Sequence, residues 1–213
     1  MTQQWLQKPI LGLVTNRKTT SNIQELCEKI MLAVRGGVDF VQIRENDLPT
    51  NELYDVAKKI NIAIDDKALV IINDRVDIML ALDLPGVHLT ENSLDVCKIK
   101  KLVGDEKLIT GSAHDLSRAI SLDEWGIDLV LAGTMYPSSS HPGKVPEGPD
   151  LLGNISRTIS CPVVGIGGID ITKIEELYSK GAAGIAVITN ILNSTDPEEA
   201  AFLLKTKLIT TQH

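Results

Sequence analysis

Residues that are able to do acid–base chemistry stand next to short apolar runs in this sequence. An imidazole with an ordinary pKa near ~6.5 can both take up and release a proton at neutral pH. His114 follows one apolar run, beside Ser112, and is predicted to be the catalytic residue. The alternative is a surface or helix-capping histidine. His88 lies inside an apolar run and is interpreted as a hydrogen-bonded core residue.

A glycine pair near the end of the chain has the composition of an anion site. Glycine carries no side chain, so the backbone can come close to a phosphate and point its N–H groups at it. The residues predicted to bind phosphate are this pair and the start of the next loop, namely Gly167, Gly168, Ile188 and Thr189. The alternative is a tight strand-to-helix turn in which glycine only relieves steric crowding.

Other polar residues follow the apolar runs or lie in a long loop over residues 136–149. The residues predicted to bind substrate are Gln42, Arg44, Asn73, Ser112, Ser138, Ser140 and His141. Arg44 either binds a ligand anion or pairs with Glu45 or Asp74. The run Asn73-Asp74-Arg75 brings a carboxylate to a metal or an amide to a heterocycle, or simply begins a helix.

Eight β-branched runs must position these side chains, and segments with helical spacing lie between them. Several runs, such as LVII and PVVGI, are almost continuously apolar, which is typical of parallel strands covered on both faces. This alternation predicts an α/β fold, a single-domain (β/α)8 TIM barrel over residues 1–213, with its chemistry at the carboxyl ends of the strands. An open doubly wound sheet is the alternative. The expected strands are 10–15, 38–43, 68–72, 86–89, 107–111, 128–133, 162–167 and 184–189.

Capping residues mark where helices begin. Ser21 precedes a helical pattern over 22–35, Pro49-Thr50 one over 51–64, and Asp115 one over 116–124. Asp170 precedes a pattern over 171–179, and Asp196-Pro197 places proline at the first position of the last helix. Aspartate and serine oxygens accept hydrogen bonds from the first free N–H groups of a helix, and proline lacks the N–H that would be left unpaired.

Composition excludes several classes of protein. The 213 residues are 43% hydrophobic and 23% charged, with a net charge of −7, which argues against disorder and against a general surface for nucleic acid or anionic membranes. The three cysteines lie far apart, so neither a disulfide framework nor a zinc site is expected. No window approaches the ~20 apolar residues of a membrane span. A cytoplasmic protein is expected.

Seven ordered blocks of the sequence resemble the thiamine phosphate synthase/TenI superfamily. The resemblance implies a (β/α)8 barrel that acts in thiamine biosynthesis on a thiazole phosphate or its pyrimidine partner. Because barrels of this family are commonly dimers, it also implies a homodimer. The blocks are VQIRE (41–45), INDRVD (72–77), GVHL (86–89), GSAH (111–114), AGTMYPSSSHPG (132–143), PVVGIGGI (162–169) and GAAGIAVIT (181–189).

Three departures from the synthase pattern favour the TenI branch. Asn46 and His141 stand where the synthase has lysines for pyrophosphate, and Ser93 stands where it has a second aspartate for magnesium. The resemblance therefore predicts a thiazole tautomerase, an isomerase without cofactor that aromatises a carboxylated dihydrothiazole phosphate. His114 would move the proton, and Arg44 would meet the carboxylate.

Two other functions stay open at this point. The first is thiamine-phosphate synthase, a transferase that joins hydroxymethylpyrimidine pyrophosphate to thiazole phosphate with magnesium on Asp74. Gln42 and Asn73 resemble the pyrimidine-binding residues of that enzyme. The second is a non-catalytic ligand-binding or regulatory relative.

Overall fold

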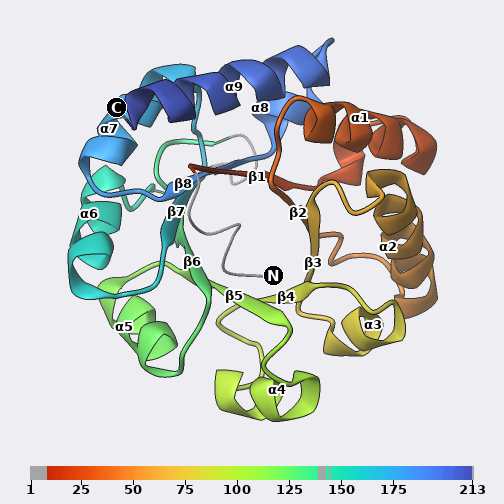
Figure 1. The fold of residues 1–213 in the computed structure, drawn as a ribbon, viewed down its shortest axis with the longest axis horizontal. Helices are drawn as coiled ribbons and strands as arrows, with labels where there is room; N and C mark the ends of the chain where they lie inside the picture. The colour runs from red at the N-terminus through yellow and green to blue at the C-terminus, as the bar shows by residue number, and fades with distance from the viewer. Residues whose placement is uncertain (1–8, 139–142, 144, 213) are drawn as a thin grey trace.

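Eight parallel strands close into a barrel in the computed structural model, which describes residues 9–138, 143 and 145–212 (Figure 1). Each strand pairs with its neighbours in sequence order, and β1 also pairs with β8, where Ile10 lies opposite Gly184. The (β/α)8 barrel is confirmed, and closure excludes the open doubly wound sheet. The strands are β1 (Ile10–Val14), β2 (Phe40–Ile43), β3 (Leu69–Asn73), β4 (Gly86–Leu89), β5 (Leu108–Ala113), β6 (Leu129–Gly133), β7 (Val163–Ile166) and β8 (Gly184–Val187).

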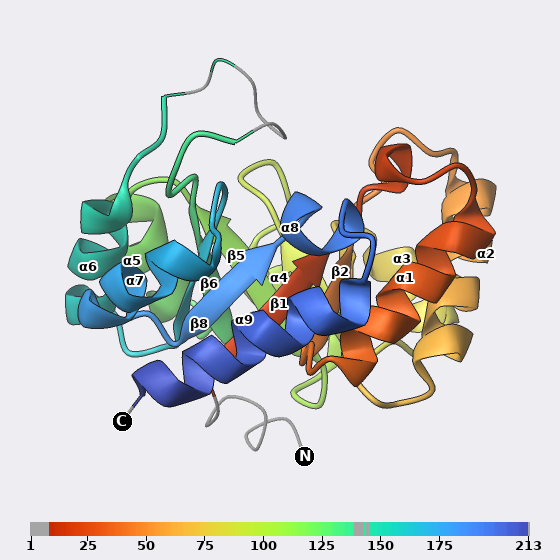
Figure 2. The same ribbon diagram turned by 90° about the horizontal axis from the view of Figure 1, so that it is seen from above.

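Helices form a ring around the barrel (Figure 1). In the described part of the chain, none of them is long and apolar enough to cross a membrane. β8 is followed by a one-turn helix and then by the long last helix, which runs along the outside of β1 and β8 (Figure 2). The helices are α1 (Ile23–Arg35), α2 (Thr50–Ile64), α3 (Val76–Ala81), α4 (Val96–Val103), α5 (Leu116–Glu124), α6 (Pro149–Thr158), α7 (Ile174–Ser179), α8 (Thr189–Leu192) and α9 (Pro197–Thr211), with 3-10 turns η2 (Arg17–Thr19) and η3 (Ile171–Lys173).

The helix starts match the capping signals in most places. Asp115 accepts a hydrogen bond from the Arg118 N–H, and Asp196 caps α9 with proline at its first turn, as predicted. The first helix differs, because Asn22 rather than Ser21 caps α1. The segment expected as one helix over 171–179 divides into η3, which Asp170 caps, and α7, which begins without a side-chain cap.

The barrel interior is a packed apolar core with a polar layer above it. Phe40 fills the interior, and its ring lies where a Cβ on Gly12 would sit, only 2.2 Å from Cζ. This close approach requires glycine at position 12. Side chains pointing inward from the strands complete the core, namely Ile10, Val14, Ile71, Leu108, Leu129, Leu131, Val164 and Ala186. A second, larger cluster lies between the strands and the helices.

The two phenylalanines of the chain allow a matched test of this core. Phe40 is 4% exposed and Phe202 on α9 is 54% exposed. We expect Phe40→Ala to lower the free energy of unfolding by about 4 kcal/mol, because it removes a large buried ring and leaves a cavity. Phe202→Ala should change it by less than about 0.5 kcal/mol. Urea denaturation measures both, and equal losses would contradict this account of the barrel interior.

Candidate active site

A cavity of about 570 Å³ opens at the carboxyl ends of the strands. The loops after the strands gather on that side, where the described parts of the segment between β6 and α6 stand above the barrel (Figure 2). Ser140 and His141 lie outside the described residues. The structure brings the other predicted binding and catalytic residues together as lining of this one cavity, namely Gln42, Arg44, Asn73, Ser112, His114, Ser138, Gly167, Gly168, Ile188 and Thr189.

Two buried amides form the wall at β2 and β3. The Gln42 Nε2 donates to Asn73 Oδ1 at 3.0 Å, and the Asn73 Nδ2 donates to Asn46 Oδ1 at 3.2 Å. Gln42 and Asn73 are 3% and 5% exposed, and their mutual bonding offsets the cost of taking amides out of water. A few fixed polar groups of this kind set the orientation of a ligand in a pocket.

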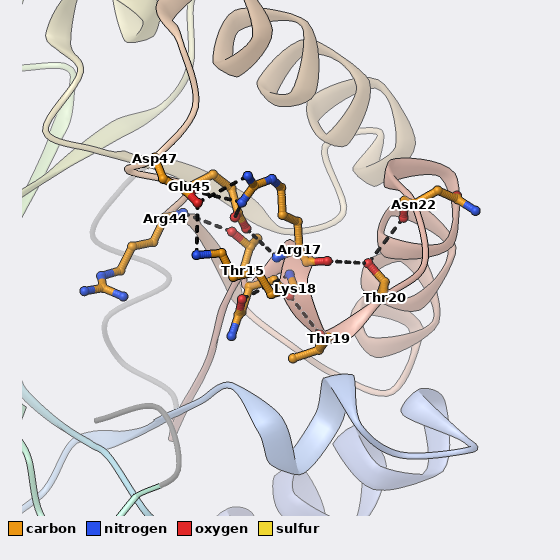
Figure 3. Close-up of polar contacts among 10 residues, drawn as sticks. Thr15, Arg17, Lys18, Thr19, Thr20, Asn22, Arg44, Glu45 and Asp47 are labelled. Carbon is orange, nitrogen blue, oxygen red and sulfur yellow. Dashed lines mark hydrogen bonds and ion pairs between the residues drawn. The ribbon is translucent and has the colours of Figure 1, made fainter. Parts of the chain in front are cut away.

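Arg44 supplies positive charge to the cavity. It is the single lysine or arginine among the described lining residues, and its backbone N–H donates to Thr15 Oγ1 at 3.0 Å (Figure 3). Within the described part of the chain it makes no ion pair, so neither Glu45 nor Asp74 neutralises it. An arginine left unpaired at the mouth of a pocket is suited to a ligand anion.

Glu45 fastens the loop after β2 to the loop after β1. Its side chain is 3% exposed, and Oε1 accepts a hydrogen bond from the Arg17 backbone N–H at 2.9 Å. The Arg17 guanidinium lies 3.6 Å from Glu45 Oε2 and donates to Asp47 Oδ1 at 2.9 Å (Figure 3). Lys18 Nζ is also 3.0 Å from Asp47. These contacts fix the backbone directly after Arg44.

The glycine pair follows β7 in the left-handed backbone region, with φ of +100° at Gly167 and +64° at Gly168. A Cβ on Gly167 would lie 2.4 Å from Thr134 Cγ2, and one on Gly168 would lie 2.4 Å from the Pro137 carbonyl oxygen. Only glycine fits this turn. The tight-turn interpretation is therefore correct for the backbone, and the pair still lines the cavity opposite the amide wall. Phosphate binding there stays a prediction.

His114 lies at the rim of the cavity, with its side chain 41% exposed. Its Nδ1 contacts the Gly133 carbonyl oxygen and lies 3.8 Å from Glu147 Oε1. A carbonyl oxygen can only accept, so Nδ1 carries the hydrogen, and in a neutral ring Nε2 is left with a lone pair. The ring is arranged as a base at Nε2. Its catalytic role stays a prediction.

Asp74, which follows β3, is held by the residue that replaces the second aspartate. The Ser93 hydroxyl donates to Asp74 Oδ1 at 2.5 Å and accepts from the Thr90 backbone N–H at 2.7 Å. Ser93 therefore orients one oxygen of the carboxylate. No group of three or more acidic, histidine or cysteine side chains gathers as a metal cluster among the described residues.

Several lining residues were missed by the sequence predictions. They are short polar side chains in the loops after the strands, namely Thr90, Asn92, Thr134, Asp170 and Asn193. The signal that could have found most of them is position alone, since loops that follow barrel strands line the mouth. Asn193 follows α8, and no sequence pattern distinguishes it from a surface residue. His88 is buried and hydrogen-bonded, as predicted, and also reaches the cavity.

Comparison with known proteins agrees on one family. The family model described as thiamine monophosphate synthase matches residues 11–191. Thiamine-phosphate synthase 2 of Streptococcus pneumoniae is 34% identical over 92% of this chain and 94% of its own length. Thiamine-phosphate synthase of Enterococcus faecalis is 35% identical over 84% and 85%. The solved structure of thiamine phosphate pyrophosphorylase from Pyrococcus furiosus superposes with a TM-score of 0.85 at 27% identity, covering 98% of this chain and 99% of that one.

The prediction of a thiazole tautomerase, and so of an isomerase, is wrong. The relatives from Streptococcus pneumoniae and Enterococcus faecalis, at 34% and 35% identity, are named thiamine-phosphate synthase, which is a transferase. The prediction gave decisive weight to Asn46, Ser93 and His141 as missing charges. In the structure, Ser93 bonds to Asp74 and Asn46 joins the amide wall, so the neighbouring synthase-like residues keep an ordered arrangement.

The Glu45 contacts lead to a matched pair of substitutions in one loop. Glu45→Ala should lower the free energy of unfolding by about 3 kcal/mol, because it removes a buried acceptor and leaves the Arg17 N–H unpaired. Asp47→Ala removes an exposed partner of the same arginine and should have little effect, because solvent screens surface ion pairs. Thermal and urea unfolding compare the two variants. A larger loss at Asp47 would contradict the role given to Glu45.

Proposed function

We propose that this chain, which belongs to the thiamine monophosphate synthase family, is itself a thiamine-phosphate synthase. It joins hydroxymethylpyrimidine pyrophosphate to a thiazole phosphate and releases pyrophosphate. The observation that carries the proposal is the match to relatives of that name over most of both chains. The cavity supports it, because one wall offers amides for a heterocycle and the facing turn offers backbone for a phosphate.

The reaction exchanges one bond for another at a single carbon. The bond between the methylene carbon of the pyrimidine and the pyrophosphate oxygen breaks, and pyrophosphate leaves with the electron pair. The thiazole nitrogen supplies the pair for the new carbon–nitrogen bond. The main demand on the protein is to align the two rings and to stabilise the negative charge that grows on the leaving group.

Each side of the cavity serves one part of this reaction. Gln42 and Asn73 bind the pyrimidine ring, while Arg44 faces the pyrophosphate and stabilises its growing charge. The turn at Gly167 and Gly168 receives the phosphate of the thiazole. The bonds that fix the amides and the loop of Arg44 hold these groups in place before the substrates arrive.

Magnesium fits this site through Asp74. Mg²⁺ in such sites is bound by one or two carboxylates together with substrate phosphates, so a cluster of three protein ligands is not required. Ser93 takes one oxygen of the Asp74 carboxylate, and Glu91 lines the same side of the cavity. When bound, the ion neutralises charge on the pyrophosphate. Asp74 would hold the ion through the carboxylate that the Ser93 hydroxyl orients.

A synthase assay tests the proposal directly. The protein mixed with hydroxymethylpyrimidine pyrophosphate, thiazole phosphate and Mg²⁺ should form thiamine phosphate and one equivalent of pyrophosphate, measured by chromatography. Arg44→Ala should lower kcat/KM by about 100-fold, because it removes charge stabilisation from the leaving group. Arg35→Ala, an exposed arginine at the end of α1, is the matched control and should leave the rate unchanged. Absence of thiamine phosphate from the wild-type reaction would overturn the proposal.

Restoring a second carboxylate tests the place of the metal. Ser93→Asp puts two carboxylates side by side, so without metal they repel and the melting temperature should fall. Added Mg²⁺ should recover that loss, and the Mg²⁺ concentration for half-maximal rate should drop roughly tenfold. Ser93→Asn is the uncharged control and should show neither response. If Mg²⁺ stabilises Ser93→Asp no more than Ser93→Asn, the ion does not bind at Asp74.

A further inference from the structure

Three polar side chains in the barrel interior form a hydrogen-bonded chain that reaches the cavity and has no role in the reaction described so far. His88 on β4 lies opposite Thr110 on β5 in the strand register, and Ser112 points inward two residues further along β5. His88 Nδ1 is 2.8 Å from Thr110 Oγ1, and His88 Nε2 is 2.7 Å from Ser112 Oγ. Ser112 and His88 both reach the cavity.

The imidazole of His88 is neutral. Burial lowers the pKa of His88 to about 3, with the positive charge of Arg44 as a smaller cause. A neutral ring has one N–H and one lone pair, so its two hydroxyl partners cannot play the same part. One hydroxyl must donate to the ring, and the other must accept from it.

The burial of Thr110 decides the direction. Thr110 is 1% exposed, and among the described residues its hydroxyl meets His88 Nδ1 as its one hydrogen-bond partner. A buried hydroxyl that does not donate costs free energy, so the Thr110 O–H donates to Nδ1. Nε2 then carries the ring hydrogen and donates to Ser112 Oγ. The hydrogen of the Ser112 hydroxyl is left to point into the cavity.

The position of His88 and Ser112 in the barrel indicates which substrate Ser112 meets. In the strand register His88 lies beside Asn73 of the amide wall, whereas the glycine turn belongs to β7 on the other side of the barrel. Ser112 is therefore near the substrate that the amides bind. The ligand atom that faces it has to be a hydrogen-bond acceptor, because the serine offers its hydrogen.

We propose that His88 is a positioning residue that holds Ser112 as a hydrogen-bond donor toward an acceptor atom of the pyrimidine pyrophosphate. The identity of that ligand rests on the proposed synthase function. The direction of the chain, from Thr110 through His88 to Ser112, rests on the hydrogen-bond geometry and on the neutral state of the buried ring, and does not depend on the synthase function. In this proposal His88 acts through the serine.

Replacing His88 by Asn or by Gln tests whether the histidine orients Ser112 or only fills space in the core. An Asn side chain reaches about as far as Nδ1 and a Gln side chain about as far as Nε2, so His88→Gln keeps a donor for Ser112 and His88→Asn does not. We expect His88→Asn and Ser112→Ala each to lower kcat/KM for the pyrimidine pyrophosphate about tenfold. The KM for thiazole phosphate should not change. His88→Gln should stay within about threefold of wild type.

The double variant His88→Asn/Ser112→Ala should be no slower than Ser112→Ala alone, because the histidine has nothing left to orient. A second measurement needs no turnover and no variant. In wild-type protein labelled with ¹⁵N-histidine, the His88 hydrogen should appear on Nε2, with Nδ1 unprotonated.

Several results would overturn the proposal. They are equal rates for folded His88→Asn and His88→Gln, additive losses in the double variant, or a hydrogen on Nδ1 in the spectrum. Failure of the synthase function would show itself differently, as no thiamine phosphate from wild-type protein. The nitrogen spectrum would still decide the direction of the chain in that case.

Discussion

The pairing of β1 with β8 is the constraint on which the rest of this structure depends. Ile10 lies opposite Gly184, and the two strands stay in parallel register along β1. Because the ladder closes, every strand has two neighbours and all carboxyl ends meet in one ring. Side chains that are far apart in sequence, such as Gln42 and Ser112, therefore line one cavity. If β1 and β8 did not pair, the sheet would be open and these side chains would be spread along its edge.

Above the apolar core of the barrel, the polar side chains can stay buried because they form hydrogen bonds with one another. Gln42 stands two residues after the core residue Phe40 on the same inward face, and Asn73 follows Ile71 in the same way. The amides bond to each other, and His88 bonds to two hydroxyls, so the desolvation cost of each group is largely offset. These hydrogen bonds orient the polar side chains before any ligand binds, as the proposed alignment of two rings requires.

Positive charge is scarce among the described residues that line this cavity, and that scarcity explains both the wrong prediction and the proposed role of a metal. Arg44 is the one lysine or arginine among its described lining residues, in a protein whose net charge is −7. Taken one position at a time, Asn46 and Ser93 indicate a lost pyrophosphate site. Taken together in space, Ser93 orients Asp74 and Asn46 extends the amide wall. The sequence shows that a charged residue has been replaced at such a position, but it does not show which groups the new side chain contacts.

The sequence by itself determined the strand order and the class of fold, because apolar runs at regular spacing leave few ways to bury both faces of a parallel sheet. It also indicated part of the cavity lining, including Gln42, Asn73 and Ser112. It also indicated the family through motifs that follow the strands. Only the tertiary structure decided which polar groups pair. Asn22 rather than Ser21 caps α1, Glu45 meets Arg17, and His88 lies between two hydroxyls. Such pairings depend on register and on distances of a few ångströms, which residue types and spacing along a chain do not contain.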